Sequence, residues 1–291
     1  MAQMPSLFCF GLGFSAQTLA ARLKSKGWRV AGTTRSPERA EALTAAGYEV
    51  FMFGPEGPVP DLGAALSGAS HVLVSVPPGP AGDPVLSIQG RGPSPLKGTR
   101  WLGYLSTTGV YGDHGGDWVD EQTPVSPSSE RAKRRVAVEH AWQVLGSAFK
   151  VPVHVFRLAG IYGPGRNQLE SLRDGSARRI VKTGQVFSRI HVEDIATVLE
   201  ASIARPNAGA IYNVCDDEPA PPHEVVEYAA KLLGIPPPPL EQFDEAARTM
   251  SEMALSFYAD SKRVKNDRMK NELGVSLRYP TYREGLMALR K

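Results

Sequence analysis

The sequence lacks the features that would mark a disulfide-rich or membrane-spanning protein. Only two of its 291 residues are cysteine, Cys9 and Cys215, and both lie inside apolar runs. We therefore expect two buried thiols in a reducing compartment and no disulfide framework. No stretch approaches the roughly 18 uninterrupted apolar residues that a membrane-spanning helix needs, so we expect no membrane partner.

The sequence also lacks a strong excess of one charge. Its 33 basic and 30 acidic residues leave a formal net charge of +3. Proteins that track phosphate backbones concentrate Lys and Arg, so this balance predicts no nucleic-acid partner. No basic residue precedes the apolar run near the N-terminus, and Gly11 and Gly13 interrupt that run. We therefore interpret it as a strand and turn, not a signal peptide, and predict a cytoplasmic protein.

The apolar residues indicate strands that alternate with helices. Continuous apolar runs are typical of strands buried on both faces, and helical patterns follow several of them. This alternation predicts an α/β fold, with a doubly wound parallel sheet (Rossmann fold) and a smaller C-terminal substrate lobe. The predicted strands are 7–10, 28–33, 49–53, 71–76, 101–106 and 153–158.

Proline and glycine mark the expected boundaries. Residues 77–99 are rich in both, so we expect a short or irregular helix there, and a second proline-rich break lies at 235–239. Beyond it we predict helices at 244–257 and 261–273, the latter ending at Gly274. We assign 1–165, with about 190–215 returning to it, to the Rossmann domain. The smaller lobe comprises 166–189 and 216–291.

The segment CFGLGFSA at 9–16 carries a GxGxxA pattern between a predicted strand and a predicted helix. Glycines there let the backbone approach a pyrophosphate, whose charge the helix N-terminus favours. A tight strand-to-helix turn without a ligand is the alternative. In the context of a doubly wound sheet we predict a dinucleotide site. Its binding residues would be Gly11, Gly13, Phe14, Ser15 and Ala16.

The segment GTTRS at 32–36 ends the second predicted strand. An Asp or Glu at this corner would accept a hydrogen bond from the adenosine ribose of NAD, but none is present. Hydroxyl groups and a guanidinium suit a 2′-phosphate, so NADP(H) is favoured over NAD(H) as the cofactor. A solvated surface arginine is the alternative. The predicted cofactor residues here are Thr33, Thr34, Arg35 and Ser36.

Three further segments follow predicted strands. YLSTTGVYGD at 104–113 places consecutive hydroxyls at a strand end, where ligands of such folds bind, although Ser and Thr also occur there for structural reasons. RLAGIYGPGR lies at 157–166 and RIHVEDIA at 189–196. His191 and Asp194 have no further ligand at metal-binding spacing, so we predict no metal and a structural turn.

Together these segments resemble signatures of extended short-chain dehydrogenases, the NAD-dependent epimerase/dehydratase family. GxGxxA, the VSVPP after the fourth strand and the C-terminal RVKNDRMKNELGVSLRYPTYREGL look like its atypical, YeeZ-like branch. The resemblance covers nearly the whole chain. It implies a Rossmann domain that holds NAD(P) and a smaller lobe that closes over a substrate cleft.

The resemblance also implies roles for particular residues. Thr107 falls where the family's catalytic Ser or Thr hydrogen-bonds the reacting oxygen. The stretch that lines the nicotinamide matches Leu158, Ala159, Gly160 and Ile161. The fourth strand would pass the cofactor at Ser75, Val76 and Pro77.

The segment SSERAKRRVAVEH at 128–140 departs from the family pattern. A Tyr-x-x-x-Lys normally begins this helix, and counting back from Glu139 places Arg131 at the tyrosine and Arg135 at the lysine. Arginine keeps its proton at any working pH, so Arg131 cannot serve as the acid. Arg135 could still donate to the nicotinamide ribose. The alternative is that all four Arg and Lys side chains of this segment face the solvent.

Two classes of function remain open. The first is an NADP(H)-binding epimerase/dehydratase-like oxidoreductase that lacks the Tyr-x-x-x-Lys pair and takes its proton from elsewhere, with Tyr111 nearest in sequence and Asp113 and His114 beside it. The second is a non-catalytic NADP(H)-binding redox or metabolite sensor. RNA binding rests on the local arginine run alone. We expect a monomer or homodimer with a small substrate, and five arginines indicate an anionic one: Arg166, Arg173, Arg178, Arg179 and Arg189.

Overall fold

The computed structural model describes residues 4–54, 62–66, 68–89 and 96–290, which fall into two compact units. The first unit comprises Met1–Ser106, Arg134–Phe156 and Ala196–Ile211. The second comprises Thr107–Lys133, Arg157–Ile195 and Tyr212–Lys291. This division differs from the predicted boundaries, because four segments expected in the Rossmann domain group with the second unit: 107–133, 157–165, 190–195 and 212–215.

A seven-stranded sheet has the order β11-β7-β5-β4-β1-β2-β3. Strands β2 and β4 flank β1, and the register pairs Phe8 with Ala31 on one side and with Val72 on the other. The β1–β2, β1–β4, β2–β3 and β4–β5 pairs are parallel, which confirms the predicted doubly wound α/β fold. Its strands are β1 Ser6–Phe10, β2 Arg29–Thr34, β3 Glu49–Met52, β4 His71–Val74, β5 Trp101–Thr107, β7 Val153–Leu158 and β11 Ile211–Val214.

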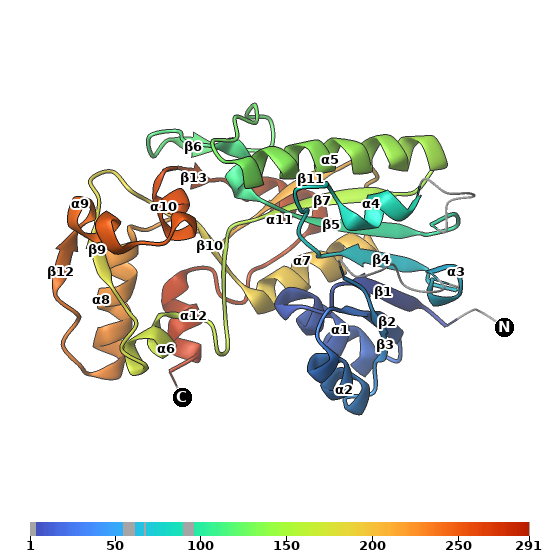
Figure 1. Ribbon diagram of the computed structural model, residues 1–291, viewed down its shortest axis with the longest axis horizontal. Coiled ribbons are helices and arrows are strands. Elements are labelled where there is room, and N and C mark those ends of the chain that lie inside the picture. Colours follow the sequence, from blue (N-terminus) through green and yellow to red (C-terminus); the bar gives the residue numbers. More distant parts are fainter. Residues whose placement is uncertain (1–3, 55–61, 67, 90–95, 291) are drawn as a thin grey trace. The chain divides into compact units, whose positions relative to one another are not determined.

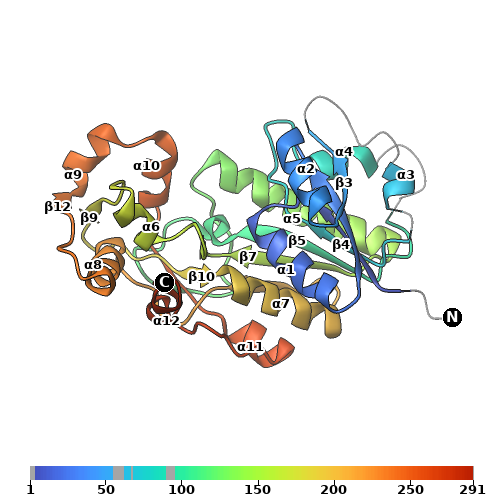
Figure 2. The ribbon, with the colours of Figure 1, turned by 90° about the horizontal axis from the view of Figure 1, so that it is seen from below.

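Helices cover both faces of the sheet in the first unit. Figure 1 shows α5 on one face and α1 on the other, and Figure 2 gives the same arrangement from below. Right-handed crossovers between parallel strands place successive helices this way. The helices concerned are α1 Phe14–Ser25, α2 Pro37–Ala45, α3 Leu62–Ala65, α4 Pro84–Gln89, α5 Glu130–Phe149 and α7 Val192–Ala204.

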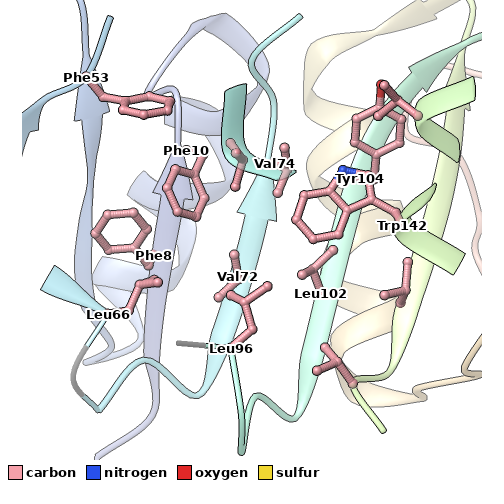
Figure 3. Close-up of a cluster of buried hydrophobic side chains, with 14 of the residues drawn as sticks. Phe8, Phe10, Phe53, Leu66, Val72, Val74, Leu96, Leu102, Tyr104 and Trp142 are labelled. Atoms are coloured by element: carbon pink, nitrogen blue, oxygen red, sulfur yellow. The ribbon is translucent and has the colours of Figure 1, made fainter. Parts of the chain in front are cut away.

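The core beneath α5 is built from alternate residues of the strands. Phe8 and Phe10 of β1, Tyr104 of β5 and Trp142 of α5 belong to one buried cluster. Figure 3 shows Tyr104 beside Trp142, with Phe8 and Phe10 on the other side of β4. Trp142 and Tyr104 are fully buried. Removing such aromatic side chains from water stabilises the fold by about 2–3 kcal/mol each.

The second unit contains short two-stranded ladders and small helices. β10 pairs with β8, β12 with β9 and β13 with β6. Tyr162, Leu169 and Tyr282 belong to a buried apolar cluster within this unit. Its elements are η1 Thr108–Tyr111, β6 Trp118–Val119, β8 Gly160–Tyr162, α6 Gln168–Arg173, β9 Arg179–Val181, β10 Arg189–His191, α8 Pro222–Leu233, β12 Leu240–Gln242, α9 Phe243–Ala246, η2 Ala247–Thr249, α10 Glu252–Tyr258, β13 Arg263–Val264, α11 Asp267–Leu273 and α12 Tyr282–Ala288.

Two predicted helices were wrong in extent. The one expected at 244–257 is broken, because the backbone is extended at Met250 and the Ser251 side chain caps a new helix by accepting from the Ala254 N–H. The one expected at 261–273 begins only at Asp267, because Arg263–Val264 forms a ladder with Trp118–Val119. The short helix expected within 77–99 is confirmed as α4, although residues 90–95 lie outside the described part.

Both cysteines are buried free thiols, as predicted. Among the residues that the structure describes, no helix has both the length and the apolar character needed to cross a bilayer.

Candidate functional site

The turn from β1 into α1 is closely packed against the end of β4. Gly11 has φ +90°, and a Cβ there would lie 2.9 Å from Ser75 Oγ and 3.0 Å from Val76 Cγ1. Only glycine combines this backbone with this clearance. The Ser75 hydroxyl donates to the Gly11 carbonyl at 2.6 Å. Two predicted cofactor segments are therefore joined directly, and the Ser75 hydroxyl serves to hold the turn.

The first turn of α1 has the properties of an anion site. Gly13 is the N-cap and supplies no side chain for capping, and no acidic residue lies in the first turn. A Cβ at Gly13 would meet no atom within 4 Å, so the space beside the helix start is open. A helix N-terminus carries a partial positive charge and outward N–H groups. Residues 13–16 therefore fit a pyrophosphate.

The end of β2 uses its hydroxyl groups internally. Thr33 is 1% exposed, and its Oγ1 accepts from the Gly11 N–H at 2.8 Å. Thr34 Oγ1 accepts from the Ser36 N–H at 3.4 Å, and Ser36 Oγ accepts from the Arg39 N–H at 3.2 Å. Arg35 is exposed. Of the four residues predicted to select the cofactor, Arg35 alone presents a charged group to solvent.

A guanidinium lies at the end of β5. Arg135 on α5 donates through Nη1 to Tyr104 OH at 3.1 Å and to the Leu105 carbonyl at 2.5 Å. Tyr104 pairs with Val74 of β4, so this group lies beside the strand that leads into Ser75 and Val76. Burial raises the pKa of the Tyr104 phenol, and the Arg135 charge opposes that shift. The side chain at the predicted lysine position is therefore turned toward the sheet.

The cations at the start of α5 differ in their exposure to solvent. Arg131 and Lys133 are exposed, and Lys133 pairs with Glu130 at 2.8 Å one turn away. Arg135 is half-buried against the strand. The solvated-face alternative therefore describes Arg131 and Lys133 but not Arg135.

The strand end that carries Thr107 is held by a buried polar contact. Ser106 donates to Glu139 Oε1 of α5 at 2.5 Å, and Glu139 is 4% exposed. Thr107 itself is half-buried, and its Oγ1 accepts from the Gly109 N–H at 3.1 Å, which caps η1. The Thr107 hydroxyl can therefore donate its own proton in a hydrogen bond to a further acceptor. The resemblance implies such a role, in which this hydroxyl hydrogen-bonds the reacting oxygen.

The Tyr111 hydroxyl is fully buried in the second unit. It donates to Asn213 Oδ1 at 2.8 Å and accepts from Arg157 at 3.0 Å. Burial raises the pKa of this phenol, and Arg157 and Asn213 oppose the shift. Both bonding directions of the hydroxyl are occupied, which argues against Tyr111 as the proton donor.

The two neighbours of Tyr111 also have structural partners. Asp113 accepts from the Ser261 N–H at 2.8 Å, and this bond lowers the pKa of its carboxyl. His114 Nε2 lies 3.1 Å from the Tyr111 carbonyl, to which it donates. Both side chains therefore bond backbone groups of the second unit.

The stretch predicted to line the nicotinamide lies at the junction of β7 and β8. Leu158 and Ala159 are buried, Gly160 is exposed and Ile161 is half-buried. The Ala159 N–H donates to the Val214 carbonyl at 3.1 Å and the Gly160 N–H to Ser188 at 3.1 Å. Its backbone is thus fixed, and its contact with a cofactor stays a prediction.

The arginines that indicated an anionic ligand are largely bonded already. Arg173 pairs with Glu170 at 2.7 Å, Arg178 with Glu241 and Arg179 with Glu227. Arg189 is buried and donates to the carbonyls of Phe187 and Ala220 at 2.8 and 3.1 Å. These four guanidiniums do not form a free cationic patch.

His191 and Asp194 have the structural surroundings that we predicted. Asp194 accepts from the Arg278 and Tyr279 N–H groups at 2.7 and 3.0 Å, and His191 Nδ1 accepts from the Glu193 N–H at 3.1 Å. Within the described ranges no three His, Cys, Asp or Glu side chains gather as a metal site.

Comparison with known proteins shows which proteins this chain is similar to. Residues 96–215 match the NAD dependent epimerase/dehydratase family. The chain is 28% identical to Protein YeeZ of Escherichia coli K12, over 95% of this chain and 97% of YeeZ. Residues 96–215 therefore resemble the NAD dependent epimerase/dehydratase family, and the chain over nearly its whole length is similar to Protein YeeZ.

Two solved structures are similar to this chain in fold. A conserved protein of unknown function from Silicibacter pomeroyi is 51% identical, with a TM-score of 0.88 over 99% of this chain and 98% of that one. UDP-glucuronic acid 4-epimerase from Bacillus cereus, solved with UDP-glucuronic acid and NAD, has a TM-score of 0.78 at 16% identity, over 99% of this chain and 98% of that one. This second likeness shows the epimerase/dehydratase fold.

Three buried polar residues of the first unit escaped the sequence reasoning. They are Tyr104 and Glu139, already described, and Asp83, which lies in the proline-rich break. Tyr104 lies in the segment YLSTTGVYGD, but an apolar strand pattern does not indicate that one phenol contacts a cation on a neighbouring helix. Asp83 followed by Pro84 is a helix-start signal that could have been recognised.

Proposed function

We propose that this chain is an NADP(H)-dependent epimerase/dehydratase-like oxidoreductase that works without the family's Tyr-x-x-x-Lys pair. The observation that carries the proposal is the start of α1. There Gly11 is required by clearance, Gly13 leaves open space, and no acidic or capping side chain competes for the helix N-terminus. Such a start supports a bound pyrophosphate more than a purely structural turn.

The choice of NADP(H) rests on the end of β2. Arg35 is exposed, and the hydroxyls around it are used by the backbone. A guanidinium is always charged and binds phosphate in a bidentate way. NADP(H) presents a 2′-phosphate where NAD(H) presents a hydroxyl, so Arg35 favours the former.

In this proposal, only a few groups would take part in hydride transfer, binding of the reacting oxygen and proton exchange. The bound dinucleotide supplies hydride transfer. Thr107 would donate its hydroxyl proton to the reacting oxygen, as in the family. Arg135 would hold the nicotinamide ribose in place of the lysine, supported by its bonds to Tyr104 and Leu105. The net proton would pass to or from water, because Arg131 stays charged and the Tyr111 hydroxyl is engaged.

The substrate that fits best is small and lacks a diphosphate. Free cations would favour a nucleoside diphosphate, but Arg173, Arg178 and Arg179 are each paired with a glutamate. The buried free thiols Cys9 and Cys215 support a reducing compartment such as the cytoplasm.

A second candidate is a non-catalytic NADP(H)-binding sensor. Arg131 is exposed at the tyrosine position, and Tyr111 has no free bonding direction, which favours loss of catalysis. Both candidates require saturable cofactor binding. Only the enzyme should transfer hydride to a carbonyl compound.

The test titrates NADPH and NADH into purified protein while melting temperature and tryptophan fluorescence are followed. We expect saturation with both and tighter binding of NADPH. A screen of small aldehydes and ketones, read as loss of NADPH absorbance, then separates the enzyme from the sensor. Binding of neither cofactor would refute both candidates.

A further inference from the structure

Three polar side chains share the inward face of α5. Arg135, Glu139 and Trp142 are spaced by four and three residues, which aligns them on one side of a helix. Each forms a hydrogen bond with the sheet or with α4. Buried polar groups stabilise a fold only when their partners are correctly placed, so these bonds specify the position of α5.

Asp83 is the hydrogen-bond partner of Trp142, and the proposed function assigns it no role. Its Oδ2 accepts from the Trp142 indole N–H at 3.1 Å. Its Oδ1 accepts from the Val85 and Leu86 N–H groups at 2.7 and 3.2 Å, which caps α4. The carboxyl is 5% exposed. One buried side chain thus ties the beginning of α4 to the middle of α5.

The segment before Asp83 connects it to the end of β4. Gly79 and Gly82 exchange backbone hydrogen bonds at 2.9 and 3.1 Å and close a tight turn. This turn follows Ser75–Pro77, where β4 passes the proposed cofactor. Because the turn and α4 both hold this segment, the backbone of residues 76–82 has little conformational freedom while Asp83 keeps its hydrogen bonds.

Asp83 is also linked to Arg135 through α5, because its partner Trp142 lies on the same face of that helix as Arg135. Burial raises the pKa of its carboxyl, and the bonds from Trp142, Val85 and Leu86, together with the Arg135 charge, oppose that shift. By bonding Trp142, Asp83 helps to fix the helix from which Arg135 bonds Leu105.

We propose that Asp83 is a positioning residue for the dinucleotide, which holds both the loop after β4 and the Arg135 guanidinium in their binding arrangement. The inference rests on the proposed function, because it concerns the same cofactor. Asp83 itself bonds Val85, Leu86 and Trp142, so its effect on affinity would pass through those groups and Arg135.

The test compares NADPH affinity with stability in matched variants. Asp83→Asn keeps one oxygen for the cap but removes the charge and the acceptor for Trp142. Arg135→Met removes the guanidinium. Ser202→Ala is the control, because Ser202 Oγ accepts from the Trp101 indole N–H at 3.0 Å, an equivalent buried bond between β5 and α7.

We expect Asp83→Asn and Arg135→Met each to weaken NADPH binding by about five- to twentyfold in the isothermal titration of folded protein. The double variant should lose little more than the larger single effect, because coupled residues are not additive. Asp83→Glu should recover part of the affinity. Ser202→Ala should lower the unfolding midpoint but change NADPH affinity by less than about twofold.

The outcomes are distinguishable. If Asp83→Asn loses stability but keeps wild-type NADPH affinity, the inference is wrong while the proposed function stands. If wild-type protein binds neither NADPH nor NADH, the proposed function fails and the inference fails with it. If Asp83→Asn does not fold, Trp142→Phe removes the same bond and should weaken NADPH binding; unchanged affinity there would also overturn the inference.

Discussion

Replacing Arg35 by alanine tests cofactor choice at a single exposed side chain. Thr33 is buried and Ser36 caps α2, so removal of the Arg35 side chain leaves the bonds that shape this corner in place. We expect Arg35→Ala to weaken NADPH binding and to leave NADH binding nearly unchanged. The physical reason is that the 2′-phosphate, which only NADPH carries, loses its counter-charge.

The magnitude follows from the exposure of Arg35. A hydrogen bond to a charged group contributes about 1.5–3 kcal/mol, while fully exposed ion pairs contribute about 0–1 kcal/mol. An exposed guanidinium that binds a phosphate lies between these limits, at about 1–2 kcal/mol. This corresponds to a loss of roughly five- to thirtyfold in NADPH affinity.

The assay measures dissociation constants for NADPH and NADH by calorimetric titration at two salt concentrations. Arg29→Ala is the control, because Arg29 is exposed at the opposite end of the same strand, roughly 20 Å away at the rise of a β-strand. That distance exceeds the Debye length of about 10 Å at 0.1 M salt, so Arg29→Ala should have little effect on either cofactor.

Equal losses of NADPH and NADH affinity in Arg35→Ala would show that this side chain does not select the cofactor. A similar loss in Arg29→Ala would show that general surface charge, and not a local contact, attracts NADPH. In wild-type protein the preference for NADPH should shrink as salt rises, because the contact is exposed.

The remaining predictions concern the helix start, pH and the substrate. Gly11→Ala should lower the unfolding free energy by about 1–3 kcal/mol through backbone strain, whereas Gly13→Ala should keep stability and weaken NADPH binding, as melting and titration would show. Burial lowers the pKa of His154 from 6.5 to about 4, so the folded state favours the neutral ring. In urea unfolding, the contribution of the neutral His154 ring to the free energy of unfolding should be fully present above about pH 6.5. That free energy should then fall by roughly 2 kcal/mol as the pH drops to about 5, and His154→Gln should remove this fall. UDP-glucuronic acid at about 1 mM should leave the melting temperature unchanged, because Arg178 and Arg179 are paired; a clear rise would contradict the proposed substrate class.

The sheet of the first unit was largely predictable because its signal is local. Strands buried on both faces are often continuous apolar runs, as in Leu7–Phe10, and the structure contains a strand there. The C-terminal region was harder, because its short ladders depend on distant partners. Arg263–Val264 pairs with Trp118–Val119, which no pattern near residue 263 indicates.

The candidate site was predictable in residue type but not in the use of each side chain. Thr33 and Ser75 were expected at the cofactor, yet their hydroxyls bond the backbone of the fingerprint turn. Sequence can place a hydroxyl at a strand end, but whether it faces a ligand or a neighbouring carbonyl depends on packing between strands. Tyr111 is the strongest example, because its partners Asn213 and Arg157 lie far away in the chain.

The position of Arg135 limits what chemistry the altered helix can support. In the family pair, lysine binds the ribose and lowers the pKa of the adjacent tyrosine, so one change could remove both functions. Here the cation is retained and bonded to Leu105, while Arg131 is solvent-exposed and always charged. Under the proposed function, the absence of the tyrosine would remove one protein acid, while Arg135 would still contact the cofactor. A reaction that suits this arrangement is one whose oxygen needs only a hydrogen bond, such as that from Thr107, while water exchanges the proton.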